Sequence, residues 1–140
     1  AAAILITSED YARAHGMKAR ARVVATANMG DDPTLMLNAP VPAAKKVLEK
    51  AGMTADDIDI WEINEAFAVV TMAAIKDLDL DPAKVNVNGG ACALGHPIGA
   101  TGARIITTLL HALKRSGGKR GIAALCIGGG EATAIAVELA

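Results

Sequence analysis

Three polar or glycine-rich blocks constrain the fold of this chain more than any other feature, because each lies at the end of a predicted strand. The blocks are Asn64-Glu65-Ala66-Phe67, the run from Gly89 to Gly102, and Cys126-Ile127-Gly128-Gly129-Gly130. In an α/β sheet the residues that follow neighbouring strands meet at one edge. We therefore expect Asn64, His96 and Cys126 to surround one small cavity at the rim of a sheet.

The order of the predicted elements favours an α/β fold with helices on both faces of a sheet. Apolar runs and turn residues predict strands over residues 1–7, 20–28, 58–63, 85–88, 120–127 and 132–139, and helices over residues 8–15, 43–51, 64–78 and 99–116. The last two strands form a hairpin around the glycine turn. The helix over residues 64–78 is apolar on nearly all sides, so it is predicted to be buried, with Asn64 as its N-cap. The whole chain has 140 residues, of which 52% are hydrophobic, and this length and composition suit one domain over residues 1–140.

Charge and composition argue against several classes of partner. The net charge is −1 and only three aromatic side chains are present, so neither an electrostatic footprint nor a stacking surface for nucleic acid is expected. No apolar run approaches the roughly 20 residues of a membrane span. The two cysteines cannot form a disulfide framework, which favours a reducing compartment, the cytoplasm or an organelle matrix. Because the chain opens inside an apolar run without an initiator methionine, we interpret it as part of a longer polypeptide.

His96 is the strongest candidate for chemistry. It precedes Pro97, which restricts its backbone to extended conformations, and it lies among glycines directly before a predicted helix. A histidine in a stiff loop at a helix start suits proton transfer or the stabilisation of an oxyanion. The alternative is a structural histidine hydrogen-bonded in a tight loop. His15 and His111 have no such setting and are interpreted as ordinary surface or boundary residues.

Asn64 and Cys126 each allow a structural and a chemical interpretation. The Asn64 amide can cap a helix, and it can also hold a water molecule or donate to a developing negative charge. Cys126 can be an inert buried thiol, or it can shuttle a proton while the neighbouring Gly128 amide donates to an oxyanion. With His96, these groups are the ingredients for handling a thioester carbonyl and the acidic proton beside it.

Cys92 is interpreted mainly as a packing residue. A zinc site formed by Cys92, His96 and Cys126 is a weak alternative because no Cys-x-x-Cys spacing is present, so no metal is expected. The glycine-rich run lacks the spacing of a dinucleotide fingerprint and the Lys-Ser/Thr ending of a phosphate loop.

The three blocks, in this order and at these separations, resemble the C-terminal half of a thiolase, the family of acetyl-CoA acetyltransferases and 3-ketoacyl-CoA thiolases. The resemblance covers essentially all 140 residues. It implies a half-molecule with a five-stranded mixed sheet between helices. His96 would then be the base that activates a nucleophilic cysteine, and Asn64 would hold the water that completes a first oxyanion site. Cys126 would move the α-proton, and the Gly128 amide would contribute to a second oxyanion site.

The resemblance further implies an acyltransferase that uses coenzyme A thioesters as substrates and needs no separate cofactor. The reaction would be Claisen condensation of acetyl-CoA or thiolytic cleavage of a 3-ketoacyl-CoA. The family's nucleophilic cysteine and much of its coenzyme A surface belong to the N-terminal half, so this chain alone is expected to be inactive. Family members also associate into homo-oligomers, dimers or tetramers. A non-catalytic acyl-CoA or lipid carrier domain, or a folded module with no chemistry, remains an alternative. Glu131-Ala132-Thr133 departs from the Met-Gly or Gln-Gly of many members, which leaves the acyl chain length open.

Overall fold

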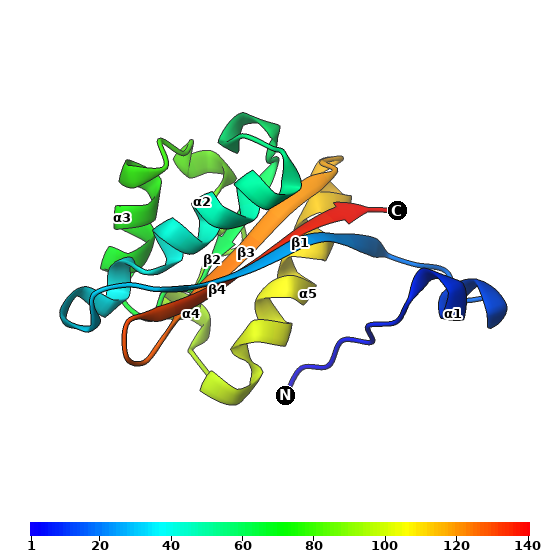
Figure 1. Cartoon of the computed structure of the whole chain (residues 1–140), viewed down its shortest axis with the longest axis horizontal. Coiled ribbons are helices and arrows are strands. Elements are labelled where there is room, and N and C mark those ends of the chain that lie inside the picture. Colours follow the sequence, from blue (N-terminus) through cyan, green and yellow to red (C-terminus); the bar gives the residue numbers. More distant parts are fainter.

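A mixed four-stranded sheet forms the centre of the computed structural model, which describes residues 1–140 (Figure 1). The strands are β1 (Ala21–Gly30), β2 (Ile60–Ile63), β3 (Arg120–Ile127) and β4 (Glu131–Leu139), and their order across the sheet is β1-β4-β3-β2. β2 is parallel to β3, and β4 is antiparallel to both β3 and β1. The predicted hairpin at the end of the chain is confirmed, and so is the α/β class.

Helices cover both faces of this sheet and bury two separate apolar clusters. Helices α2 (Pro40–Ala51) and α3 (Ala68–Asp77) pack over one face, and α5 (Ile98–Ser116) packs on the other. Along β2 the side chains alternate, because Trp61 and Ile63 join the cluster under α2 whereas Ile60 joins the cluster under α5. Glu62 therefore lies on the α5 face of the sheet. None of the helices is both long enough and apolar enough to cross a membrane.

The sheet has four strands rather than the five that the resemblance implies. Residues 85–88 do not form a strand, and only Val85 makes a single parallel bridge, to Trp61 on the free edge of β2. Pairing stops there because Asn86 adopts a left-handed backbone conformation with φ of 48°, which no extended strand can accommodate. The strand predicted over residues 85–88 is thus reduced to one residue pair.

The remaining elements are short and end at capping residues. They are α1 (Glu9–Ala14), α4 (Ala91–Leu94) and the 3₁₀ turns η1 (Pro33–Asn38), η2 (Ala55–Asp57) and η3 (Pro82–Lys84). Ser8 accepts a hydrogen bond from the Tyr11 N–H at the start of α1, as predicted. Thr54 and Asp57 form a capping box at η2, in which the Thr54 N–H donates to Asp57 Oδ2 at 2.8 Å, as the threonine and the aspartate three residues later in the sequence indicate.

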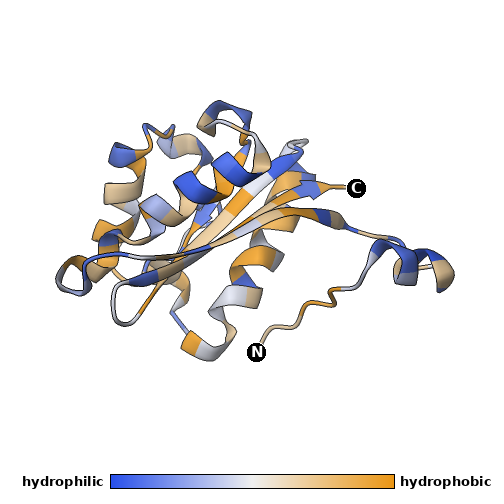
Figure 2. Ribbon diagram, viewed as in Figure 1, coloured by the Kyte–Doolittle hydropathy of each residue, from blue (hydrophilic) through white to orange (hydrophobic).

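The expectation of a buried strand over residues 1–7 is wrong. These residues form no strand, and Leu5 and Ile6 are 77% and 70% exposed. Helix α1 buries no residue, and with the preceding apolar segment it extends away from the sheet (Figures 1 and 2). An apolar strand pattern is satisfied only when another strand pairs with it, and no strand of this chain does.

The expectation of a buried helix capped by Asn64 is also wrong. Helix α3 begins at Ala68, with Phe67 at its N-cap position, and buries only Val70, Thr71 and Ala74. Phe67, Val69 and Met72 are 61%, 52% and 66% exposed. A helix that is apolar on all sides presents no preferred face, so one of its apolar sides stays uncovered here.

Candidate active site

The candidate site lies where the parallel strands β2 and β3 end side by side. Asn64 directly follows β2 and stays on the sheet, since its backbone N–H donates to the Ala124 carbonyl at 2.9 Å. Its side chain is buried, with only 1% of the residue exposed. Cys126 lies two residues further along β3, at the same edge of the sheet. The carboxyl ends of parallel strands are where α/β folds place ligands.

His96 is held by the loop between α4 and α5. Gly95 has φ of 87°, a backbone conformation that suits glycine, and it ends α4 by donating its N–H to the Ala91 carbonyl at 2.7 Å. The Nδ1 atom of His96 lies 2.7 Å from Thr101 Oγ1. Thr101 donates its only hydroxyl proton to the Pro97 carbonyl at 3.1 Å, so its oxygen must accept from His96. The neutral imidazole therefore carries its proton on Nδ1 and a lone pair on Nε2.

The lone pair of His96 faces Asn64. The Nε2 atom lies 3.5 Å from Asn64 Nδ2, a long hydrogen bond that joins residues 32 positions apart. The amide N–H is the donor and the imidazole nitrogen is the acceptor. The fold thus brings two of the predicted site residues together, with a proton-accepting nitrogen and an amide donor beside each other at the rim of the sheet.

A second network fixes the two loops that carry these residues. Glu65 accepts hydrogen bonds from the Cys92 N–H and from Asn86 Nδ2, both at 3.0 Å. Asn86 in turn accepts from the Ile63 N–H and donates to the Ile63 carbonyl, both at 2.8 Å. Burial alone would raise the pKa of Glu65, but the Cys92 and Asn86 donors outweigh burial and hold the pKa below its ordinary value. The ionised Glu65 carboxylate therefore ties the loop after β2 to the start of α4.

Gly90 is the position at which these loops touch. A Cβ atom built on Gly90 would lie 2.2 Å from the carboxyl carbon of Glu65, closer than any contact between non-bonded atoms. Only glycine leaves room for the carboxylate here. This requirement explains one glycine of the central block, for which the sequence alone indicated no individual role.

Cys126 and the glycine turn form the second half of the rim. Cys126 pairs with Ala132 across the hairpin, and its half-buried position raises the pKa of the thiol above its ordinary value. Gly129 and Gly130 have φ of 92° and 87°, as this turn requires, while Gly128 faces open space. Gly130 packs directly on the loop after β1, where its carbonyl accepts from the Asp31 N–H at 2.7 Å.

No hydrogen bond joins Cys126 or Gly128 to His96 or Asn64, so the rim consists of two adjacent parts. Cys92 is exposed, so the prediction of a packing role for it is wrong; its backbone N–H donates to Glu65. The three side chains of the zinc alternative do not form a metal-binding cluster. Both cysteines are free.

Sequence reasoning missed Thr101, Glu62 and Arg104, all of which are close to the rim. Thr101 is fully buried and lies one helical turn beyond His96, a spacing that could have identified it. Glu62 is the one acidic residue in an otherwise apolar strand, and it is also buried. A carboxyl group in such a place requires a partner, and this requirement was the available signal.

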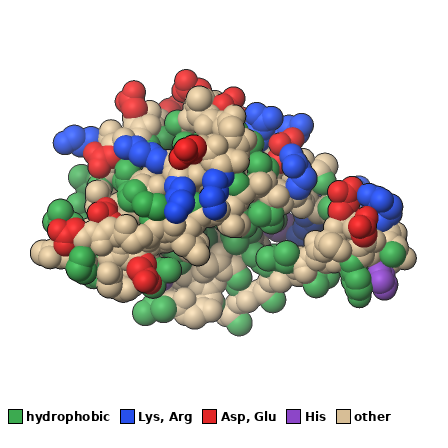
Figure 3. All heavy atoms as spheres, viewed as in Figure 1, with side chains coloured by type: hydrophobic (Ala, Val, Ile, Leu, Met, Phe, Trp, Pro, Cys, Tyr) green, Lys and Arg blue, Asp and Glu red, His purple; other side chains and the backbone are tan.

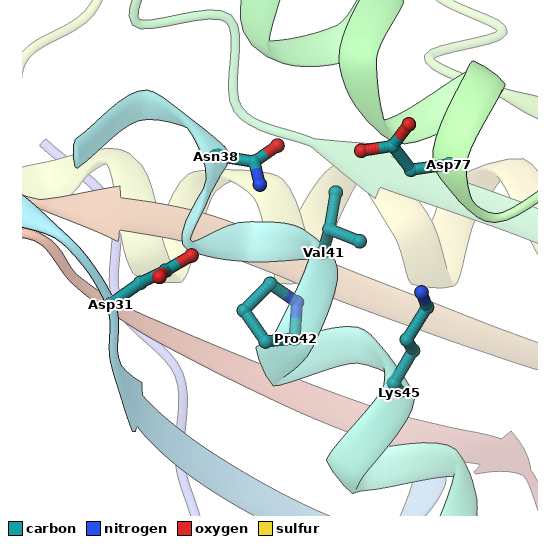
Figure 4. A pocket seen from close by; sticks show the side chains of 6 residues that line it. All are labelled: Asp31, Asn38, Val41, Pro42, Lys45 and Asp77. Atoms are coloured by element: carbon teal, nitrogen blue, oxygen red, sulfur yellow. The ribbon is translucent and has the colours of Figure 1, made fainter. Parts of the chain in front are cut away.

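A separate polar hollow of about 380 Å³ lies away from this rim, between β1, α2 and α3. Figure 4 shows the Lys45 side chain pointing toward Asp77 on one side of it, with Asp31 and Asn38 on the other side. None of the predicted site residues lines it. Figure 3 shows acidic and basic side chains interspersed over the same face of the molecule, without a patch of one sign.

Comparison with known proteins identifies the class to which this fold and site belong. Residues 17–139 match the family described as "Thiolase, C-terminal domain". The chain is 50% identical over 138 residues to the cytosolic acetyl-CoA acetyltransferase of Mus musculus, and 50% identical over 138 residues to a steroid 3-ketoacyl-CoA thiolase of Mycobacterium tuberculosis. Each match covers 99% of this chain. The crystal structure of the Bacillus anthracis acetyl-CoA acetyltransferase superposes with a TM-score of 0.92 at 50% identity and covers 95% of this chain.

The fold and the sequence together define an α/β chain of the thiolase class. The chain belongs to the thiolase family, and residues 17–139 match the model of that family's C-terminal domain. It spans 35% of the length of the Mus musculus relative, 34% of the Mycobacterium tuberculosis relative and 34% of the Bacillus anthracis chain. The family that the sequence motifs indicate is thereby confirmed.

Proposed function

We propose that this domain supplies the acid–base half of a thiolase active site, which transfers acyl groups between coenzyme A thioesters. The observation that carries the proposal is the contact of 3.5 Å between Asn64 Nδ2 and His96 Nε2, with the opposite imidazole nitrogen held by Thr101. The relatives named as acetyl-CoA acetyltransferase and 3-ketoacyl-CoA thiolase support the same reaction class.

His96 acts on the nucleophile in this proposal. Its Nε2 lone pair takes the proton of a cysteine thiol, the thiolate attacks the thioester carbonyl, and the coenzyme A thiolate leaves as the acyl-enzyme forms. While the tetrahedral intermediate exists, the imidazolium and a water molecule held by Asn64 donate to its oxyanion. The Nδ1 hydrogen bond to Thr101 persists throughout, because the proton arrives on the other nitrogen.

Cys126 acts on the carbon acid. The departing coenzyme A thiolate takes the proton of the Cys126 thiol, and the Cys126 thiolate then removes the α-proton of a second acetyl thioester. The resulting carbanion attacks the acyl-enzyme carbonyl, forms the new carbon–carbon bond and expels the nucleophilic cysteine as a thiolate. In the reverse direction the neutral thiol returns that proton to the enolate which cleavage releases. The raised pKa of Cys126 supports the neutral thiol as the resting form. The Gly128 N–H, which lies in open space beside the turn, donates to the oxyanion of the acyl-enzyme intermediates.

The reaction also needs groups that we assign to an N-terminal thiolase half, namely the nucleophilic cysteine and much of the surface for coenzyme A. The α5 face of the sheet supports such a partner. Beside α5 an apolar hollow of about 190 Å³ remains, lined among others by Thr26, Ile106, Leu125, Thr133 and Ile135. Exposed apolar surface of this kind favours association. Homo-oligomers, dimers or tetramers, belong to the same proposal, and the cytosolic relative from Mus musculus supports a cytoplasmic location.

Two measurements test the proposed function. The purified 140-residue chain should not cleave acetoacetyl-CoA with coenzyme A, and turnover by this chain alone would contradict the division of roles. When the chain is joined to an N-terminal thiolase half, thiolysis should appear, and mass spectrometry should detect an acyl-enzyme after incubation with acetyl-CoA. Replacement of His96 with alanine should abolish acyl-enzyme formation while the fold persists. If acyl-CoA binds but no acyl-enzyme forms in the unmutated protein, the carrier alternative holds instead.

A further inference from the structure

Two ionisable side chains near the end of β2, the buried Glu62 and the half-buried Arg104, are not used by the proposed chemistry. Glu62 is only 1% exposed, and its Oε1 atom has no hydrogen-bond partner. Arg104 of α5 has two buried nitrogens, Nε and Nη1, that also lack a partner. Buried polar atoms are almost always hydrogen-bonded, so an unpartnered carboxylate oxygen and an unpartnered guanidinium in one layer require a common explanation.

The positions of these side chains follow from the strand and the helix that carry them. Glu62 precedes Asn64 by two residues, so both side chains lie on the α5 face of the sheet. Arg104 follows Thr101 by three residues, so both lie on the same side of α5. The pair therefore forms the next layer below the chain of contacts that joins Asn64, His96 and Thr101.

Electrostatics supports this proximity. Burial raises the pKa of Glu62 to about 7, while the positive charge of Arg104 acts in the opposite direction and the negative charge of Glu65 adds to the rise. No ion pair or hydrogen bond joins Glu62 to Arg104 directly. The guanidinium is thus close enough to act on the carboxyl group while two of its N–H groups remain available.

A third unpartnered atom completes the arrangement. Asn64 Oδ1 is buried and accepts no hydrogen bond, whereas Asn64 Nδ2 faces His96. The other unpartnered buried atoms lie elsewhere, on Thr71 of α3 and on Arg120, whose Nε is 3.5 Å from Glu138 Oε2. Near the rim, two buried acceptor atoms therefore lack a donor, namely Glu62 Oε1 and Asn64 Oδ1. Two buried donor atoms of Arg104, Nε and Nη1, lack an acceptor on the same face of the sheet.

We propose that Arg104 is a positioning residue for the active site, whose guanidinium donates to Asn64 Oδ1 and Glu62 Oε1 through one water molecule each, and so fixes the orientation of the Asn64 amide. An amide held through its oxygen must present its N–H to His96 and to the substrate. Loss of the donors lets the amide rotate by a half-turn, which would replace the N–H donor with a carbonyl oxygen. Glu62 keeps the guanidinium in place as a hydrogen-bond acceptor.

Because this inference rests on the proposed function, its first test does not depend on activity. In ¹⁵N-labelled protein, Arg104→Met should shift the Asn64 side-chain amide resonances, and Lys114→Met should not. Lys114 lies on the same helix, is exposed and makes no hydrogen bond, so it is a matched control. If Arg104→Met does not fold, Arg104→Lys provides the same readout, since a point charge replaces the planar fork of donors. Unchanged Asn64 resonances in the folded variant overturn the proposal.

The second test is a double-mutant cycle in the complete enzyme. Arg104→Met should lower kcat for thiolysis about 10-fold with little change in KM, because only part of one transition-state donor is lost. In an Asn64→Ala background the same substitution should change kcat by less than about twofold. Arg104→Lys should restore part of the loss. If Arg104→Met lowers kcat equally in both backgrounds, Arg104 does not act through Asn64 and the proposal fails. If Asn64→Ala itself leaves kcat unchanged, the proposed role of Asn64 fails, and the amide spectra decide whether Arg104 still orients it.

Discussion

Thr101 Oγ1 accepts the Nδ1 proton of His96 at 2.7 Å while it donates its own proton to the Pro97 carbonyl at 3.1 Å. This pair of bonds has only one consistent direction, because a hydroxyl has a single proton. Thr101, the buried residue in the first turn of α5, therefore determines which imidazole nitrogen is free to accept a proton. A helix that packs on the sheet thereby determines the chemistry of a loop residue.

Replacement of Thr101 with valine should impair catalysis more than folding. Valine matches the shape of threonine but removes the oxygen, so Nδ1 loses its acceptor and the other tautomer of His96 becomes accessible. We expect kcat for thiolysis to fall about 10- to 100-fold, in the range of general-base catalysis. Thr101→Ser, which keeps the oxygen, should retain most activity. Equal activity of the valine and serine variants would contradict the assigned tautomer.

Cys126 and His96 should control different half-reactions. Cys126→Ala should abolish the exchange of acetyl α-protons with deuterated water, because the group that removes them is gone. The same variant should still form the acyl-enzyme from acetyl-CoA, whereas His96→Ala should not. Proton NMR of the thioester and mass spectrometry of the protein measure the two steps. Retained exchange in Cys126→Ala would show that another base moves the α-proton.

Gly90→Ala should destabilise the domain by about 1–3 kcal/mol, the usual range for overpacking. The new methyl group would occupy the place of the Glu65 carboxylate, so the hydrogen bonds to Cys92 and Asn86 would break or shift. Gly99→Ala is the matched control, since a Cβ there meets no atom within 4 Å. Urea unfolding of both variants measures the difference, and similar midpoints for the two would contradict the close approach at Gly90.

Glu62 should make stability depend on pH in an unusual direction. Its pKa is about 7 in the folded state and 4.5 in an ordinary environment, so between these values the folded state holds a proton that the unfolded state has lost. Stability therefore falls as pH rises through this window, by up to about 3 kcal/mol. Glu62→Gln should remove this slope.

Urea unfolding at pH 5 and pH 8 tests this dependence. The carboxyl groups with lowered pKa, those of Asp57, Asp59, Glu65 and Glu138, lose their stabilising contribution only as pH falls below about 4. They do not interfere in the window of Glu62. If the unmutated protein and Glu62→Gln lose stability equally between the two pH values, Glu62 is not the group responsible.

Much of the fold could be predicted because strands and helices in this chain carry their own boundary signals. Gly52 and Gly117 end α2 and α5 in left-handed conformations, and the glycine turn joins β3 to β4. The rim residues His96 and Asn64 were predicted because a histidine before proline and an amide after a strand are visible in the sequence. Their contact depends on how the loop before α5 lies against the end of β2, and the hydrogen bond from the Cys92 N–H to Glu65 that ties these two segments together could not be predicted from the sequence.

The errors arose where burial depends on partners rather than on pattern. Residues 1–7 were predicted to form a buried strand, but only a neighbouring strand could bury them, and none of the four strands of the sheet pairs with them. Phe67 and Met72 read as core residues because the periodicity of α3 does not say which side meets the sheet. Glu62 and Arg104 were missed for the opposite reason: each is a common surface residue whose significance appears only when both are seen in one buried layer.

Asn86 has a consequence beyond the site. Its backbone N–H donates to the Trp61 carbonyl, and its side chain occupies both the N–H and the carbonyl of Ile63. A single amide side chain thus imitates the main chain of a missing neighbour along the outer border of β2. Unsatisfied borders of this kind recruit foreign chains and seed aggregates. Asn86 consequently protects the edge strand β2 against pairing with foreign chains, and no additional strand is needed to cover the backbone groups of Ile63.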